Sequence, residues 1–362
     1  MTKRERYLKA LHNEPTDEIV WAPNFDYWLH VSKAEGTVPE KYRGMSGNDI
    51  IRAVGGTIWR RVGGLKTVVD PSVKSRSMEV DGSTVHEIET PVGTVRSVHK
   101  PTEGPHRSKG CTEHCIKDLD SLKVMQYVAE ATHYEPNYEP VEKALEEVGD
   151  DGVVLVSCFC VPFIQFAKTD AGYVNGIYLW TDHREEVDRL IQTYHRNFIQ
   201  GYRALAGSPA DMIATGDNMD GVTMSPTLFK DYAIPFYQEA KEIIHAGGKV
   251  FAGHWCGRTE SLLHLVPGCG LDVIEAIVTA PMANITLSEA LNKLNGEVVL
   301  QGGIPSVMVC EEGCTREQFD AYVKDVILPL KGRRGFVLGM SDNVPPNADF
   351  GRVEAVAGLL NA

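Results

Sequence analysis

The sequence has 362 residues, of which 43% are hydrophobic and 23% are charged, and its formal net charge is -13. This balance is typical of a folded globular protein and excludes a disordered or fibrous chain. The acidic excess disfavours nucleic acid and anionic membranes as partners, because both attract clustered Lys and Arg, so small molecules or proteins are the expected ligands.

The first hundred residues mix helix and strand signals without regular alternation. An amphipathic stretch predicts a helix over Lys3 to Leu11, and Ile19 to Phe25 is interpreted as an opening strand. Residues 78–100 contain β-rich segments separated by Asp-Gly and Val-Gly turns, which predicts antiparallel hairpins inserted into the main fold. Such an insertion would form a lid or a docking surface for a partner.

From residue 153 onward, short apolar runs alternate with helical stretches. A helix is predicted over Arg184 to Leu205 and another over Leu228 to Ala246, which ends at Gly247-Gly248. Continuous apolar runs separated by helices indicate a parallel sheet covered on its outer face, and closure into a barrel is the expected form. The runs that predict strands are 153–158, 211–216, 249–254, 272–277, 298–302 and 335–339.

The whole chain, residues 1–362, is predicted to form one domain, because no repeat, low-complexity tract or composition shift marks a boundary. No window approaches the roughly 18 consecutive apolar residues of a spanning helix, and the start of the sequence has no signal-peptide core. We therefore expect a cytoplasmic protein. Its eight cysteines are too sparse for a disulfide framework, so reduced thiols are expected.

Polar residues follow most of the predicted strands, and a parallel barrel carries its chemistry at these carboxyl ends. His254 and Cys256 stand two positions apart at one strand end, and imidazole and thiolate are both good zinc ligands. Core packing is the competing interpretation of such a pair. A third ligand must come from elsewhere: Glu275 on the following strand is the first choice, with Asp217 and Asp342 as alternatives.

The other strand-end residues each have two interpretations. Asp217 and Asn218 either orient a substrate or cap a loop. Glu275, inside an apolar run, must be paired or metal-bound if it points inward, because buried charges need partners. Gly302 and Gly303 either allow close approach of the backbone to a ligand or form a tight turn.

These motifs resemble those of the uroporphyrinogen decarboxylase superfamily. Gly253-His-Trp-Cys-Gly257 is similar to its His-x-Cys-Gly signature, and Thr90-Pro-Val-Gly-Thr94 to its hairpin insertion. The likeness spans nearly the whole chain and implies a single (β/α)8 TIM-type barrel with an N-terminal β-hairpin insertion and an open cavity. Its other strand-end motifs correspond to Gly216-Asp-Asn218, Gln301-Gly-Gly-Ile-Pro305 and Gly339 to Pro346.

The superfamily contains cofactor-free decarboxylases and zinc-dependent, corrinoid-dependent methyltransferases. The segment Ile19 to Trp28 lacks the Arg-rich motif by which decarboxylases bind carboxylates, whereas His254 and Cys256 match the first two zinc ligands of the methyltransferases. The coenzyme M enzymes take a third ligand, Cys, near the last strand, where this chain has Met340, a much weaker ligand. This departure favours relatives that demethylate aromatic methyl ethers, with Glu275 as third ligand.

The resemblance thus implies transfer of a methyl group between a small donor and the cobalt of a cobalamin carried by a separate corrinoid protein. Asp217, Asn218 and Asp342 would be catalytic, with a proton supplied by Asp217 or a neighbour. Gly302 and Gly303 would contact the cofactor with Trp255, and Tyr27, Trp28 and Trp255 would form an aromatic wall, for which plain packing is the alternative. A methylcorrinoid:thiol methyltransferase, a cofactor-free decarboxylase and a non-catalytic corrinoid-binding or tetrapyrrole-binding protein are the alternatives. The donor, the direction of transfer and the oligomeric state stay open.

Overall fold

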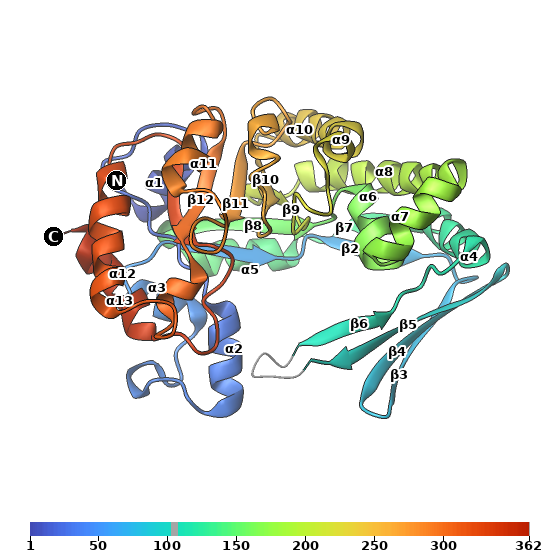
Figure 1. Ribbon diagram of the computed structural model, residues 1–362, viewed down its shortest axis with the longest axis horizontal. Coiled ribbons are helices and arrows are strands. Elements are labelled where there is room, and N and C mark those ends of the chain that lie inside the picture. Colours follow the sequence, from blue (N-terminus) through green and yellow to red (C-terminus); the bar gives the residue numbers. More distant parts are fainter. Residues whose placement is uncertain (103–107, 362) are drawn as a thin grey trace.

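A sheet of seven parallel strands forms the centre of the computed structural model, which describes residues 1–102 and 108–361 (Figure 1). Neighbouring strands are parallel throughout, so their carboxyl ends lie at one edge. In spatial order they are β1 (Ile58–Val62), β8 (Gly152–Cys158), β9 (Met212–Thr215), β10 (Val250–His254), β11 (Val273–Ile277), β12 (Val299–Ile304) and β13 (Phe336–Met340).

The inner faces of these strands converge on a small apolar core that α1 (Lys3–Leu11) covers. Side chains two positions apart along a strand share a face, which is why alternate residues of each strand meet here. From α1 come Tyr7, Ala10 and Leu11; from the strands come Val153, Leu155, Met212, Ala214, Val250, Ala252, Val273, Val299 and Val337. The helix starts with a capping box between Thr2 and Glu5, which fixes its first turn.

Helices pack on the outer face of the sheet and bury a second, larger core. The longest is α8 (Arg184–Ala206), whose buried residues recur at helical spacing, as expected for one face against the sheet. In Figure 1, α8 and α10 lie together over the middle of the sheet. The remaining helices are α2 (Asp26–Glu35), α3 (Gly47–Ala53), α4 (Leu119–Glu130), α5 (Glu139–Val148), α6 (Pro162–Ile164), α7 (Tyr173–Asp182), α9 (Pro226–Leu228), α10 (Ile234–Ala246), α11 (Leu287–Lys293), α12 (Arg316–Tyr322) and α13 (Phe350–Leu360).

The sheet does not close into the eight-stranded barrel that was predicted. Where an eighth strand would stand, Trp21 forms a single isolated bridge with Leu338 of β13. On the other side, the Thr57 N–H donates to the Trp21 carbonyl over 2.6 Å, just before β1 begins. Pro23 follows and has no N–H to continue a ladder, so the expected strand over Ile19 to Phe25 is reduced to this bridge.

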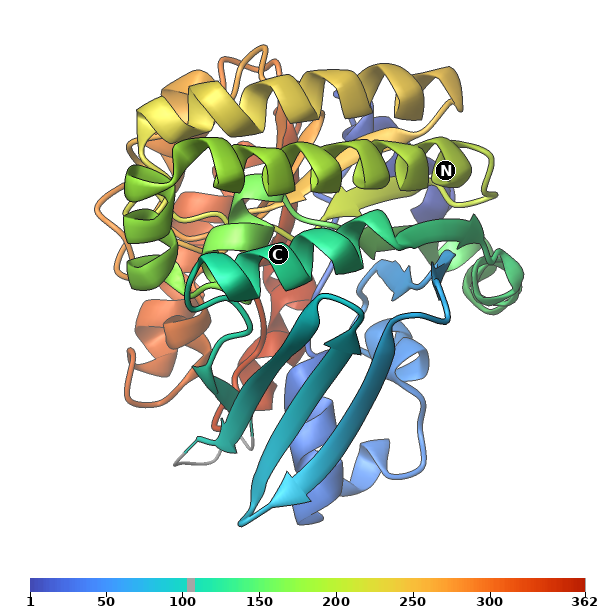
Figure 2. The same cartoon turned by 90° about the vertical axis from the view of Figure 1, so that its right-hand side faces the viewer.

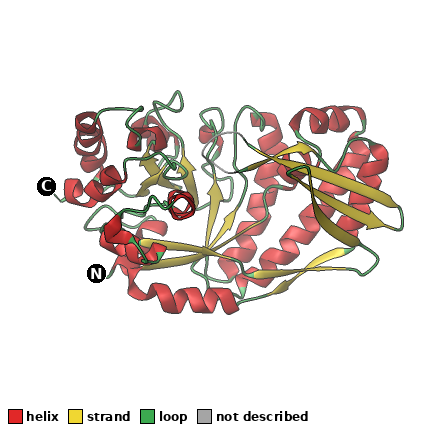
Figure 3. Cartoon of the chain, turned by 90° about the horizontal axis from the view of Figure 1, so that it is seen from below, coloured by secondary structure: helices red, strands yellow, loops and turns green. Residues whose placement is uncertain are grey.

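The predicted hairpin insertion is larger than expected. It forms a four-stranded antiparallel sheet that projects from the body of the molecule (Figure 2). In Figure 3 this sheet lies at the opposite end of the molecule from the C-terminus. Its strands are β3 (Lys74–Val80), β4 (Ser83–Thr90), β5 (Gly93–Pro101) and β6 (Lys109–Glu113), and a two-stranded sheet of β2 (Leu65–Val69) and β7 (Thr132–Pro136) connects it to the body.

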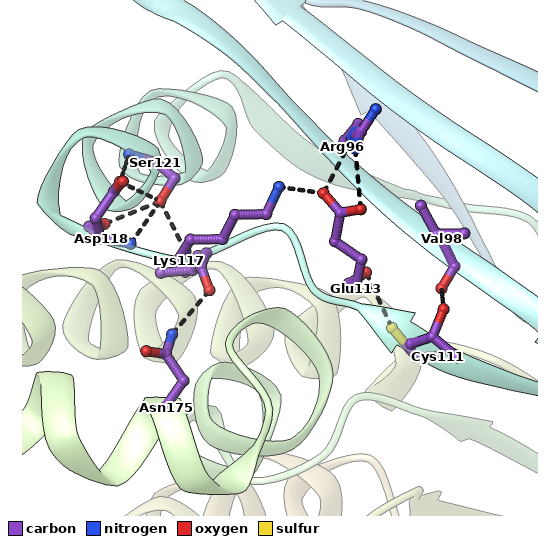
Figure 4. A network of polar contacts seen from close by, with 10 residues as sticks. Arg96, Val98, Cys111, Glu113, Lys117, Asp118, Ser121 and Asn175 are labelled. Carbon is purple, nitrogen blue, oxygen red and sulfur yellow. Dashed lines mark hydrogen bonds and ion pairs between the residues drawn. The ribbon is translucent and has the colours of Figure 1, made fainter.

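A network of polar contacts fastens this projecting sheet to the helices (Figure 4). Glu113, the last residue of β6, pairs with Arg96 of β5 at 2.9 Å and with Lys117. Asp118 then caps α4 by accepting a hydrogen bond from the Ser121 N–H at 2.9 Å. Asn175 of α7 donates to the Ile116 carbonyl over 3.1 Å, so β6 and both helices are connected through one short segment.

Most of the predicted elements of the second half are confirmed. The helix predicted over Arg184 to Leu205 is α8, and the one predicted over Leu228 to Ala246 is divided between α9, a π-helical turn and α10. In the part of the chain that the structure describes, no helix combines the length and apolar character needed to cross a membrane.

Candidate metal centre

Three potential metal ligands meet at the carboxyl edge of the sheet. His254 is the last residue of β10, Cys256 lies two residues beyond it, and Asp342 lies two residues beyond the end of β13. Their ligand atoms all lie within 4.8 Å of one another. His254 is buried and the other two are half-buried, so the group is reachable from the open edge. Imidazole, thiolate and carboxylate together are a donor set suited to zinc.

The loop after β13 holds Asp342 in a defined position. Its backbone is left-handed, with φ +78°, a conformation that Asp tolerates better than most residues. Asn24 donates its side-chain N–H to the Asp342 carbonyl over 3.0 Å, and the Ser341 hydroxyl donates to the carbonyl of Ile277 over 2.7 Å. The Asp342 Oδ1 lies 3.7 Å from Nε2 of His254. The carboxylate is therefore turned toward the imidazole by its own backbone and by two neighbouring segments.

Glu275 occupies the other side of the same imidazole. Its Oε1 is 2.6 Å from Nδ1 of His254 and 2.8 Å from Nη2 of Arg61, which lies on β1. His254 and Glu275 are partners in register on adjacent strands, so their side chains stand side by side. The structure thus places Glu275, the first choice for third ligand, outside the group that could hold a metal. Asp342, one of the two alternatives, is the carboxylate inside it. Which residues bind a metal stays a prediction.

The charges of this cluster alter its proton affinities. Burial lowers the pKa of His254, but the Glu275 carboxylate and the interaction with Cys256 outweigh it and raise that pKa to about 10. Burial raises the pKa of Glu275, and the neighbouring His254 and Arg61 overcome this and hold it below its ordinary value. Without a metal, His254 is therefore an imidazolium paired with the Glu275 carboxylate.

The strand end that carries Glu275 is irregular. The pairing of β11 with β12 shifts register between Glu275 and Ile277, and Ala276 between them has φ +68°. Such a bulge re-aims a side chain, and bulges are common beside active sites. Gly302 and Gly303, with φ +149° and +112°, lie opposite this bulge inside β12. They allow close contact with Ile277 and with Phe336 inside a strand rather than in a tight turn, and their contact with a cofactor stays a prediction.

Asp217 and Asn218 do not join the cluster. Asp217 has no exposed surface, and its carboxylate accepts hydrogen bonds from the Val161 N–H at 2.8 Å and the Tyr237 hydroxyl at 2.6 Å, and from Thr215. Burial raises the pKa of Asp217 above its ordinary value. Asp217 thus connects the loop after β8 to the end of β9. This role resembles loop capping, which was the alternative to orienting a substrate. Asn218 is exposed, with φ +45°.

The tryptophans expected to line the entrance are core residues. Trp255 is fully buried and meets Phe229 edge to face, with ring centroids 5.5 Å apart. Trp28 stacks on Phe350 at 3.9 Å. Neither presents a ring face to the open edge, and packing, the alternative for both, describes them.

Sequence reasoning missed two residues next to the cluster. Arg61 was overlooked because β1 carries two arginines and does not have the form of an apolar run. Tyr7 of α1 donates its hydroxyl hydrogen to Oε1 of Gln301 over 2.7 Å, and burial raises its pKa well above its ordinary value. The alternation of β12 could have placed Gln301 inward, but no sequence signal connects it to Tyr7.

A protein-family model and one solved structure agree with this architecture. The family described as uroporphyrinogen decarboxylase (URO-D) matches residues 98–361. A solved methyltransferase from Methanosarcina mazei is similar over 100% of this chain and 98% of its own length, with 14% identity and a TM-score of 0.61. D-psicose 3-epimerase from Clostridium cellulolyticum H10 covers 62% of this chain and 82% of its own, at 10% identity and a TM-score of 0.36. No curated protein sequence matches.

Proposed function

Because the chain belongs to the uroporphyrinogen decarboxylase family, we propose that it is a zinc-dependent methyltransferase that moves a methyl group between a small methyl donor and the cobalt of a partner corrinoid protein. The donor set of His254, Cys256 and Asp342 carries this proposal. Three protein ligands with an open fourth position are typical of catalytic rather than structural zinc. The solved protein similar over the whole chain is described as a methyltransferase, and the proposal assigns the same class of reaction here.

The charge balance of the cluster supports a divalent cation. With Cys256 as a thiolate, three negative groups face one positive group, Arg61, which itself pairs with Glu275. A dication bound to neutral His254 would compensate the two charges that remain, and buried charges require such compensation. Bound zinc would supply Lewis acidity to the heteroatom that loses or accepts the methyl group.

The surrounding residues then have positioning roles. Glu275 accepts the Nδ1 hydrogen of His254 and so keeps Nε2 directed at the metal, the usual arrangement for a histidine ligand. Arg61 holds Glu275, and Asn24 holds the backbone of Asp342. In this proposal Asp217 positions loops rather than transferring a proton, because it has no exposed surface, while the exposed Asn218 is free to contact substrate.

A cofactor-free decarboxylase is the second candidate, and Arg61 is the observation that favours it. Its guanidinium is 41% exposed and could bind a substrate carboxylate. A single arginine that already pairs with Glu275 is a weak site for a polycarboxylate, so we rank this function below methyl transfer. A methylcorrinoid:thiol methyltransferase would use the same metal group and differ in its acceptor.

Metal content and turnover test these functions together. Protein purified without chelators should contain stoichiometric zinc by elemental analysis, and His254→Ala and Asp342→Ala should lose it, while Asp182→Ala, an exposed carboxylate on α7, should retain it. Zinc-loaded protein should demethylate methoxylated donors in the presence of free cob(I)alamin, or consume methylcobalamin with a thiol. Full zinc content in both ligand variants, or turnover that survives zinc removal, would refute the proposal.

A further inference from the structure

A separate pocket of ≈ 320 Å³ opens between α4, β7 and α8, and it contains none of the three candidate metal ligands. Figure 2 shows α4 and α8 side by side. The floor and walls of the pocket combine one carboxylate, Asp170, with the four aromatic rings of Tyr134, Phe159, Tyr194 and Phe198.

Asp170 is a buried carboxylate without a counter-ion. It is 5% exposed, and its two oxygens accept hydrogen bonds from the Gln165 amide at 2.9 Å and the Tyr194 hydroxyl at 2.8 Å. Among the described residues, no Lys, Arg or His forms an ion pair with it. Burial raises its pKa to about 7, although the two hydrogen bonds lower it, so the group is about half ionised in neutral solution and largely ionised in weakly basic solution. A buried unpaired charge at a pocket is a candidate ligand partner.

The backbone around Asp170 is also unusual. Gln165–Asp170 form a π-helical turn, closed by the Ala171 N–H donating to the Phe166 carbonyl over 2.9 Å. Turns of this kind are rare and are found frequently at functional sites. Here the turn ends on Asp170 and so places the carboxylate at the pocket.

The aromatic rings form a connected wall. Phe159 stacks on Phe198 with centroids 4.5 Å apart, Phe198 stacks on Tyr194 at 5.6 Å, and Tyr134 meets Phe159 at 4.7 Å. Tyr134 and Phe159 are only partly buried, so their rings are the part of this wall that a ligand can reach. Aromatic faces attract cations through their quadrupole, and more strongly where water is excluded.

We propose that this pocket binds a small organic cation of the alkylated ammonium class, with its charge facing Asp170 and its alkyl groups against Tyr134 and Phe159. A single carboxylate is too few oxygens for Mg²⁺ or Ca²⁺, which require several. A neutral ligand would leave the carboxylate unpaired, and aromatic walls suit alkyl groups better than a hydrated inorganic ion. This proposal is independent of the metal centre and of methyl transfer.

Calorimetric titration of the full chain at constant salt tests the proposal with two ligands, choline and its uncharged carbon analogue 3,3-dimethylbutan-1-ol. Choline should bind the wild-type protein at least about tenfold more tightly than the analogue, the size expected for one desolvated cation-π or ionic contact. Asp170→Asn should lose that preference and Asp182→Asn, at an exposed position, should keep it. Tyr134→Leu should weaken choline binding with Asp170 intact.

The pH dependence gives a second readout. Affinity for choline should fall as the pH drops below about 7, because Asp170 becomes protonated. Among the described residues, the Asp170 charge acts on the titratable groups of Cys115, Tyr134, Cys160 and Tyr194, and burial raises the pKa of each further above neutrality. Equal binding of choline and its analogue, full affinity in Asp170→Asn or in Tyr134→Leu, or no choline binding by the wild-type protein would each overturn the proposal.

Discussion

Replacing Asp170 by Asn should remove a loss of stability that grows as the pH rises toward neutrality. Burial raises the pKa of Asp170 from 3.8 to about 7. Each pKa unit corresponds to about 1.4 kcal/mol, so the fully ionised group costs about 4 kcal/mol of folding free energy. Asn keeps the size and an acceptor oxygen for Tyr194, and it cannot ionise.

Whether stability rises or falls with pH depends on which state, folded or unfolded, binds the Asp170 proton more tightly. The folded protein does, because its carboxyl has the higher pKa, so the contribution of Asp170 to stability is fully present below pH 3.8 and is lost progressively as the pH rises to about 7. From about pH 5 to about pH 8 the loss amounts to roughly 2 to 3 kcal/mol. The Asn variant should not show this component, whatever constant difference the substitution itself introduces.

Urea unfolding followed by circular dichroism at several pH values gives the free energy of unfolding of both proteins. Asp182→Asn is the control for an exposed carboxylate. The difference between the free energies of unfolding of Asp170→Asn and the wild type should grow toward high pH. Parallel pH profiles for these two proteins would show that the carboxyl group titrates normally, and would refute the reasoning from burial.

Four substitutions test the centre of the molecule. Glu275→Gln should lower zinc affinity about 10- to 100-fold by losing the orienting carboxylate, whereas Asp342→Ala should abolish stoichiometric binding, and competition with a chromophoric chelator should rank them in that order. Equal affinities in the two variants would contradict their different roles. Tyr7→Phe should cost about 1 to 3 kcal/mol in urea unfolding, because Gln301 loses its buried donor, and an unchanged midpoint would contradict this. Gly303→Ala should cost on the order of 1 to 3 kcal/mol or more, because φ is +112° and its space is filled, and a variant as stable as the wild type would show that the strand relaxes.

The elements that could be predicted from sequence are those whose local residue pattern has a single physical cause, the burial of the strand. The buried strands from β8 to β13 appear as apolar runs because both of their faces are covered. β1 was missed because Arg60 and Arg61 interrupt its apolar run, and the half-exposed Arg61 pairs with Glu275, a contact that apolar patterning cannot reveal. Closure of the sheet was predicted wrongly, because the interruption at Pro23 acts through hydrogen bonds between segments far apart in the sequence.

The candidate site was predictable only in part for a related reason. His254 and Cys256 stand on one strand end, so their proximity follows from the local sequence. The third member depends on strand register. Glu275 is in register with His254, and adjacent strands lie only about 5 Å apart, so the two side chains contact each other instead of converging on a shared ion. Asp342 reaches the group through a left-handed residue that no pattern in the sequence identifies.

The position of α1 in the core determines the order in which parts of this protein can fold during synthesis. Residues 3–11 are synthesised before all the strands on which they pack, the last of which contributes Val337, and Tyr7 donates a hydrogen bond to Gln301. Contacts between such distant parts of a chain are slow to form. The core around α1 can therefore be completed only after β13 has been made. Until then the apolar side of this helix stays available to chaperones, and a translation product that stops before β12 would keep it permanently uncovered.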